Sequence, residues 1–217
     1  MPAFSHIAVP ALIPAATRLL TGARDTKEIA DALLPYGYTP AVLTDALARL
    51  AEFRAAIATQ GTEAAEARIA TQASVAASAA VRAAYVPHRV LARRAHPRGT
   101  AGYTALDLSG DIPDGELAML AHARHFYQTL AGSPDLAADI RLLSAPALVT
   151  AALARLDAAD LAEDTQVKED GESQRATALR ARLEADVRAV SSELSESATL
   201  ALADEPQLRE VLGLLER

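Results

Sequence analysis

The apolar residues of this chain recur at helical rather than strand spacing. Residues 40–57 place large apolar side chains on one side of a helix, at Leu43, Leu47, Leu50 and Ile57. A proline at the first position of a helix is well tolerated, so Thr39 and Pro40 predict where this helix begins. Ser144 to Pro146 predict an equivalent start, and Pro134 and Pro206 predict the starts of two shorter helices.

One helical sequence occurs twice in the chain, at a constant offset of 106 residues. The sequence PAVLTDALARL at 40–50 is identical in eight of eleven positions to PALVTAALARL at 146–156. Polar residues repeat as well, because Thr59 and Gln60 recur as Thr165 and Gln166. We therefore predict an all-α fold of two tandem pseudo-symmetric helical units, residues 1–110 and 111–217. We expect them to pack as one antiparallel helix bundle with a shared core.

Two polar segments, residues 60–62 and 163–175, interrupt the apolar pattern. Each is either a hairpin turn or the solvated middle of one very long helix. The glycine and the almost wholly polar composition of 163–175 favour a turn, whereas neither segment contains a proline that would break a helix. We predict turns and keep the continuous helix as the alternative. Pro87 should kink or end the helix that follows the first polar segment.

Composition supports an all-helical protein. Alanine supplies 52 of the 217 residues and aromatic residues only 4%, which favours close-packed helices over strands. No run of apolar residues approaches the length of a membrane span, and the N-terminal segment is a poor signal peptide. Cysteine is absent, which fits a reducing compartment. We expect a soluble cytoplasmic protein whose net charge of −7 makes nucleic acid an unfavourable partner.

Several stretches resemble a family of uncharacterised bacterial helical proteins. They are the segment AHARHFY at 121–127, the segment DEPQL at 204–208 leading to Leu212 and Gly213, and the Gln/Glu/Thr pattern in the middle of the long helices. The resemblance implies two tandem helical units over most of the chain. It implies no activity, ligand or catalytic residue. A short closing helix, expected in both copies, has no clear signal in the first copy around residues 96–99.

Four glutamates form the first candidate site: Glu63, Glu66, Glu169 and Glu172. Spacing of three places each pair near one face of a helix, and the two pairs are equivalent in the repeat. If the copies come together, four carboxylates can bind a divalent cation. The simpler interpretation is a solvated, glutamate-rich stretch of helix. A di-iron bundle site is not indicated, because Glu-x-x-His occurs nowhere in the chain.

His122 and His125 form the second candidate site. Spacing of three on a helix lets both imidazoles contact one metal ion or one anion. No third ligand is nearby in sequence. The alternative is that Phe126 and Leu130 pack inward while the two histidines and Arg124 lie at the boundary of the core.

Arginines form the third candidate site, for an anion or a protein partner: Arg82, Arg89, Arg93 and Arg94. Residues 82–98 contain no acidic residue, and most of these arginines align on one side of a straight helix. Such a stripe can bind phosphate, nucleic acid or an acidic protein. Residues 157–172 carry seven acidic residues and one lysine, so an internal or intermolecular contact between the two segments explains both.

The sequence contains none of the common catalytic or nucleotide-binding motifs. It therefore favours a non-enzymatic helical interaction or structural protein, which associates with itself or with a protein partner. The first alternative is a ligand- or metal-binding bundle, enzymatic or not, with its site between the repeats. The second is binding of an anionic ligand or nucleic acid through the arginines of residues 82–98. No particular cofactor is indicated.

Overall fold

The computed structural model describes residues 4–140, 143 and 145–214, and these residues are helical without any strand. In the first half of the chain the α-helices are α1 (Val9–Asp25), α2 (Lys27–Leu33), α3 (Pro40–Ala95) and α4 (Ala101–Ala105). In the second half they are α5 (Glu116–Gly132), α6 (Pro134–Asp139), α7 (Pro146–Ala201) and α8 (Pro206–Val211). Two short 3-10 helices, η1 (Phe4–His6) and η2 (Leu34–Tyr36), complete the fold. The predicted all-α class is confirmed.

The helix bounds follow the 106-residue offset seen in the sequence. Helices α3 and α7 each contain 56 residues, and both the start and the end of α7 lie 106 positions after those of α3. Helices α1 and α5 contain 17 residues each, and α2 precedes α3 as α6 precedes α7. The closing helix that the sequence leaves unmarked in the first copy is present as α4, equivalent to α8.

The two polar segments are not turns. Helix α3 continues through Gln60, Gly61 and Thr62, and α7 continues through all of 163–175, so the predicted hairpin turns are wrong and the long-helix alternative holds. A glycine inside a helix costs about 1 kcal/mol, whereas a turn would interrupt the hydrogen-bond ladder and require a second nucleation. Helix α3 also continues past Pro87 and does not end there.

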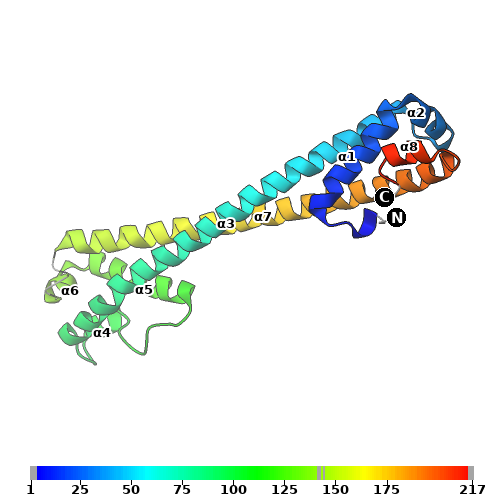
Figure 1. The fold of residues 1–217 in the computed structure, drawn as a ribbon. Helices are drawn as coiled ribbons and strands as arrows, with labels where there is room; N and C mark the ends of the chain where they lie inside the picture. The colour runs from blue at the N-terminus through cyan, green and yellow to red at the C-terminus, as the bar shows by residue number, and fades with distance from the viewer. Residues whose placement is uncertain (1–3, 141–142, 144, 215–217) are drawn as a thin grey trace. The chain divides into compact units, whose positions relative to one another are not determined.

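The chain divides into two compact units that do not coincide with the two repeats. Unit 1 comprises the described residues up to Ala64 and from Glu172 onward, and unit 2 comprises residues 65–171. Unit 1 therefore combines α1, α2 and the first half of α3 with the second half of α7 and α8. Unit 2 combines the equivalent elements, with the roles of α3 and α7 exchanged. Within each unit the α3 and α7 segments run in opposite directions (Figure 1).

Each unit has its own hydrophobic core. In unit 1, Leu19 of α1 packs with Leu50 and Phe53 of α3 and with Leu194 of α7. In unit 2, Phe126 of α5 packs with Tyr85 of α3 and Leu156 of α7. Both cores take leucines from the duplicated sequence, since Leu50 and Leu156 are equivalent and both are buried. The boundary between the repeats, at residues 110 and 111, lies inside unit 2.

The helix starts follow the prolines. Pro40, Pro134, Pro146 and Pro206 are the first residues of α3, α6, α7 and α8. The Thr39 hydroxyl accepts a hydrogen bond from the backbone N–H of Val42 at 3.4 Å, as expected for the residue that caps a helix. Ser144, predicted to begin the second long helix, lies outside the described residues. No described helix has both the length and the apolar composition needed to cross a membrane.

Candidate functional site: a polar cluster in unit 2

Unit 2 contains a group of polar side chains that unit 1 lacks, all of them buried or half-buried except that of the exposed Arg93. We call it the polar cluster, and its members are Tyr85, His88, Arg89, Arg93, Asp107, His122 and Tyr127. At an offset of 106 residues, the equivalent positions of unit 1 hold Ser191, Leu194, Ser195, Thr199, Gly213, Ala16 and Thr21. Since unit 1 has the same arrangement of helices with none of these side chains, the fold does not require them.

The centre of the polar cluster is a hydrogen-bonded chain from Asp107 to Tyr85. The Asp107 carboxylate lies 3.1 Å from Nε2 of His122, and Nδ1 of the same ring lies 2.6 Å from the Tyr85 hydroxyl. Tyr85 is fully buried, and burial raises its pKa to about 12. The Tyr85 hydroxyl therefore keeps its proton and donates a hydrogen bond to Nδ1 of His122. The Nε2–H group of His122 donates a hydrogen bond to the Asp107 carboxylate.

Asp107 occupies a conformation that the fold imposes on both units. Its φ is 45°, and the equivalent Gly213 has a φ of 75°. Glycine adopts this left-handed region freely, whereas other residues do so at a cost of about 1 kcal/mol or more. Unit 2 keeps an aspartate here, and its carboxylate orients His122 and accepts a hydrogen bond from the Ser109 hydroxyl at 3.1 Å.

A second pair, His88 and Tyr127, joins α3 to α5. Nδ1 of His88 lies 2.7 Å from the Tyr127 hydroxyl, and the two rings meet edge to face. Burial lowers the pKa of His88, and the nearby positive charge of Arg155 lowers it further. Burial also raises the pKa of Tyr127. His88 is therefore neutral at pH 7, and its Nδ1 accepts a hydrogen bond from the Tyr127 hydroxyl.

Arg89 and Arg93 hold the connector, residues 106–115, between α4 and α5. Nη2 of Arg89 donates to the backbone oxygens of Ser109 at 2.9 Å and Gly110 at 3.1 Å. Nε of Arg93 donates to the oxygen of Leu108 at 2.9 Å, and its Nη2 donates to that of Gly110. Arg89 is only 3% exposed, and its Nε is buried without a hydrogen-bond partner among the described residues.

An open cleft of about 220 Å³ lies between α3 and the connector. Its lining is Val86, Arg89, Val90, Arg93, Asp111 and Ile112. A second cleft of about 250 Å³ lies between α3 and the start of α5, and its lining includes Val75, Arg82, Asp114 and Glu116. The first cleft is thus a site with two guanidinium groups and aliphatic walls.

The other predicted arginines differ from this pair. Nη2 of Arg82 lies 3.4 Å from the backbone oxygen of Pro113. The equivalent Arg188 of unit 1 makes the equivalent contact, 2.8 Å from the oxygen of Ile7, so this arginine serves the fold in both units. Arg94 is exposed and makes no hydrogen bond or ion pair with a described residue. Within unit 2, Asp157 and Asp160 of the acidic segment 157–172 form ion pairs with Arg124 and not with any of the four predicted arginines.

The two predicted histidine ligands have separate partners. Both nitrogens of His122 are engaged in the chain described above, whereas Nε2 of His125 lies 3.1 Å from the backbone oxygen of Ala105. Phe126 and Leu130 are buried, as expected from the alternative interpretation of this segment. A shared metal or anion at His122 and His125 remains a sequence prediction.

The four predicted glutamates are divided between the units. Glu63 and Glu172 belong to unit 1, where a carboxylate oxygen of one lies within 4.8 Å of an oxygen of the other. Glu66 and Glu169 belong to unit 2, where Glu66 is exposed and Glu169 forms an ion pair with Lys168 at 3.2 Å. Binding of a divalent cation by these residues remains a prediction.

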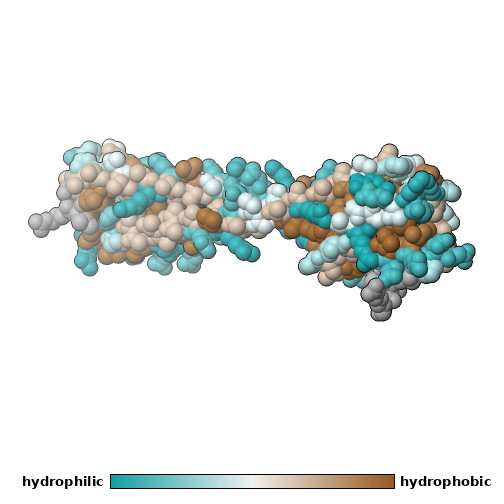
Figure 2. Space-filling model, turned by 45° about the horizontal axis from the view of Figure 1, so that its top comes forward, coloured by the Kyte–Doolittle hydropathy of each residue, from teal (hydrophilic) through white to brown (hydrophobic). Residues whose placement is uncertain are grey.

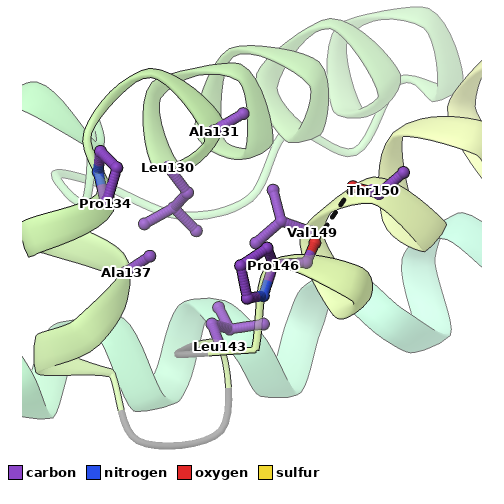
Figure 3. A pocket seen from close by; sticks show the side chains of 8 residues that line it. All are labelled: Leu130, Ala131, Pro134, Ala137, Leu143, Pro146, Val149 and Thr150. Atoms are coloured by element: carbon purple, nitrogen blue, oxygen red, sulfur yellow. Dashed lines mark hydrogen bonds between the residues drawn. The ribbon is translucent and has the colours of Figure 1, made fainter.

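Unit 2 also contains an apolar pocket of about 170 Å³ that no sequence pattern predicts. In Figure 3 the side chains of Leu130, Leu143 and Val149 point into a common space bordered by Pro134 and Pro146. The one hydrogen bond drawn runs from the Thr150 hydroxyl to the backbone oxygen of Pro146, at 3.1 Å. None of the described residues that line the pocket is charged, so they offer no ion-pair partner for a ligand.

A search for sequence motifs does not find most members of the polar cluster, because Tyr85, His88, Asp107 and Tyr127 lie far apart in sequence. Comparison of the two copies reveals them, since each is polar or aromatic in one copy and small or aliphatic in the other. Known proteins add no further information: neither models of protein families, nor curated proteins, nor solved structures give a match to this chain.

Proposed function

We propose that the protein is a non-enzymatic helical interaction protein that associates with a second copy of itself through unit 2. The observation that carries this proposal is a pair of exposed apolar side chains, Val75 of α3 and Leu117 of α5. They are 59% and 64% exposed, whereas the equivalent positions of unit 1 hold the exposed alanines Ala181 and Ala11. We define these two side chains as the association surface.

The charges around the association surface suit a contact with an identical surface. Val75 and Leu117 line neighbouring clefts that share Glu116. Arg82 borders one cleft, and Glu163 borders the other. A two-fold contact pairs each surface with itself, so an apolar centre with both signs of charge at its edge is self-complementary. Figure 2 shows one face of the molecule, on which apolar areas are interrupted by hydrophilic side chains. An association surface of only two apolar side chains favours a weak, concentration-dependent dimer.

The geometry supports binding better than catalysis. The hydroxyl groups of Tyr85 and Tyr127 belong to buried side chains, and each donates a hydrogen bond to a histidine. A nucleophile or general base must reach the substrate, which these buried groups do not. The chain has no cysteine, in keeping with the reducing cytoplasm in which we expect the protein to act.

Sedimentation velocity from about 1 to about 200 µM tests the association, because weak dimers have dissociation constants in this range. The wild-type mass should rise from 22.7 kDa toward twice that value. Val75→Asp/Leu117→Asp should remain monomeric, and the matched variant Ala181→Asp/Ala11→Asp should behave like the wild type. The proposal would be contradicted if the wild type were monomeric at every concentration. It would also be contradicted if the Val75/Leu117 variant and the Ala181/Ala11 variant weakened the dimer equally.

A further inference from the structure

We propose that the cleft between α3 and the connector binds a small monocarboxylate that carries a branched aliphatic group. This site lies beyond the proposed association and does not depend on it, because its residues are not those of the association surface. Its parts are two guanidinium groups, Arg89 and Arg93, three aliphatic walls, Val86, Val90 and Ile112, and one carboxylate, Asp111.

The first step is the unbalanced positive charge of Arg89 and Arg93. No described carboxylate lies within ion-pair distance of either residue; their hydrogen bonds go to backbone oxygens, and Arg89 also interacts with the Tyr85 hydroxyl, which is uncharged. Burying a charged group without an opposite charge is costly, and Arg89 is 97% buried while its Nε has no partner among the described residues. An anion in the cleft would offset that cost.

The second step is that both guanidinium groups are held in place before a ligand arrives. Their Nη2 atoms are tied to the connector at Gly110, which has a φ of 63°. Donors fixed in this way lose little side-chain entropy when a carboxylate binds, and guanidinium groups match the geometry of its two oxygens.

The third step selects the class of anion. Two arginines and one aspartate give the lining a net charge of +1, which suits a monoanion better than a dianion such as a phosphate monoester at pH 7. Val86, Val90 and Ile112 supply apolar contact for an aliphatic group. A volume of about 220 Å³ holds a small molecule, whereas a bound helix, about 10 Å across, would need a longer groove.

The duplication supplies an internal comparison. The α3 residues Val86, Arg89, Val90 and Arg93 are equivalent to Ser192, Ser195, Glu196 and Thr199 in unit 1. Neither the charge nor the apolar walls are therefore needed to build this part of the fold. Unit 1 should not bind the same ligand.

A titration of the full-length protein, followed by isothermal calorimetry and by NMR shifts of the arginine side chains, tests the site. The probe is 4-methylpentanoate, with 4-methylpentanamide as the uncharged analogue, acetate as the anion without an aliphatic group, and inorganic phosphate as the dianion. We expect a dissociation constant of about 0.1–1 mM for 4-methylpentanoate and at least tenfold weaker binding of the other three.

Substitutions test whether 4-methylpentanoate binds in this cleft. Arg93→Gln should weaken it at least tenfold, and Val86→Ser, which installs the residue of unit 1, should weaken it several-fold. Arg94→Gln, the matched control at the next position, should leave it unchanged. Absence of binding at about 20 mM probe, equal binding of the amide, or an unchanged constant in a folded Arg93→Gln protein would overturn the proposal. Association is measured without carboxylate, so either proposal can fail without the other.

Discussion

Unit 1 and unit 2 combine equivalent helices but differ in the chemistry of their interiors. Unit 1 encloses mainly leucines and alanines around Leu19, Leu50 and Leu194. Unit 2 encloses Tyr85, Phe126 and Tyr127 and adds histidine, aspartate and arginine around them. Because both units have equivalent helices, the side chains found only in unit 2 are not needed to form this arrangement of helices.

Positions at which both units agree report those demands. Arg82 and Arg188 bind backbone oxygens of equivalent residues, and Asp107 and Gly213 both adopt positive φ. Positions at which only unit 2 carries a positive charge, above all Arg89 and Arg93 opposite Ser195 and Thr199, mark the part of the molecule that we assign to binding. The comparison therefore separates structural arginines from functional ones, which their spacing along the chain does not.

The largest expected effect concerns the two cores. Leu50→Ala and Leu156→Ala should each lower the free energy of unfolding by about 2–5 kcal/mol, because each removes a fully buried, equivalent leucine. Hydrogen exchange measured peptide by peptide should show the loss of protection concentrated in unit 1 for Leu50→Ala and in unit 2 for Leu156→Ala. Equal loss in both units from either substitution would show that the two cores do not behave as separate clusters.

A smaller effect should distinguish the equivalent residues Tyr85 and Ser191. Tyr85→Phe removes the donor to Nδ1 of His122 and should lower the free energy of unfolding by about 1–3 kcal/mol. Ser191→Ala should be neutral or slightly stabilising, since the Ser191 hydroxyl is buried without a partner among the described residues. Denaturant unfolding followed by circular dichroism measures both. A greater loss from Ser191→Ala would contradict the assigned hydrogen bonding.

The smallest effect is a dependence of stability on pH. The pKa of His88 is lowered in the folded protein, so the unfolded chain binds a proton first as the pH falls through the unfolded value of about 6.5. The contribution of His88 is therefore intact above that pH and is lost below it. Between pH 7.5 and 5.5 the melting temperature of His88→Leu/Tyr127→Phe should fall less than that of the wild type. An identical fall in both proteins would exclude this role of His88.

The sequence predicts the helical class, the offset of the repeat and the helix starts, because these depend on local spacing and on prolines such as Pro40 and Pro146. It fails at residues 60–62 and 163–175, where polar composition suggests turns. A polar stretch of helix is stable when long helical segments flank it on both sides, so composition alone cannot distinguish the two cases.

The polar cluster is predictable only in part. Spacing identifies Arg89, Arg93 and His122 as candidates, but it associates His122 with His125, three residues away. The actual partners of His122 are Tyr85 and Asp107, 37 and 15 positions away along the chain. Such contacts depend on how α3, the connector and α5 pack, which no local pattern encodes.

The central claim is that Arg89 and Arg93 are present for binding and not for folding. The free energy of unfolding of Arg89→Met/Arg93→Met, measured in denaturant, tests it most directly, because methionine keeps much of the aliphatic stem and removes the charge. We expect a value within about 1 kcal/mol of the wild type, since at Arg89 an apolar residue of similar volume replaces a buried unpaired charge. Two of the released backbone oxygens belong to the exposed residues Ser109 and Gly110, and the third, that of the buried Leu108, accounts for the loss that we allow. A loss of about 4 kcal/mol or more would show that the arginines hold unit 2 together, and would contradict the claim.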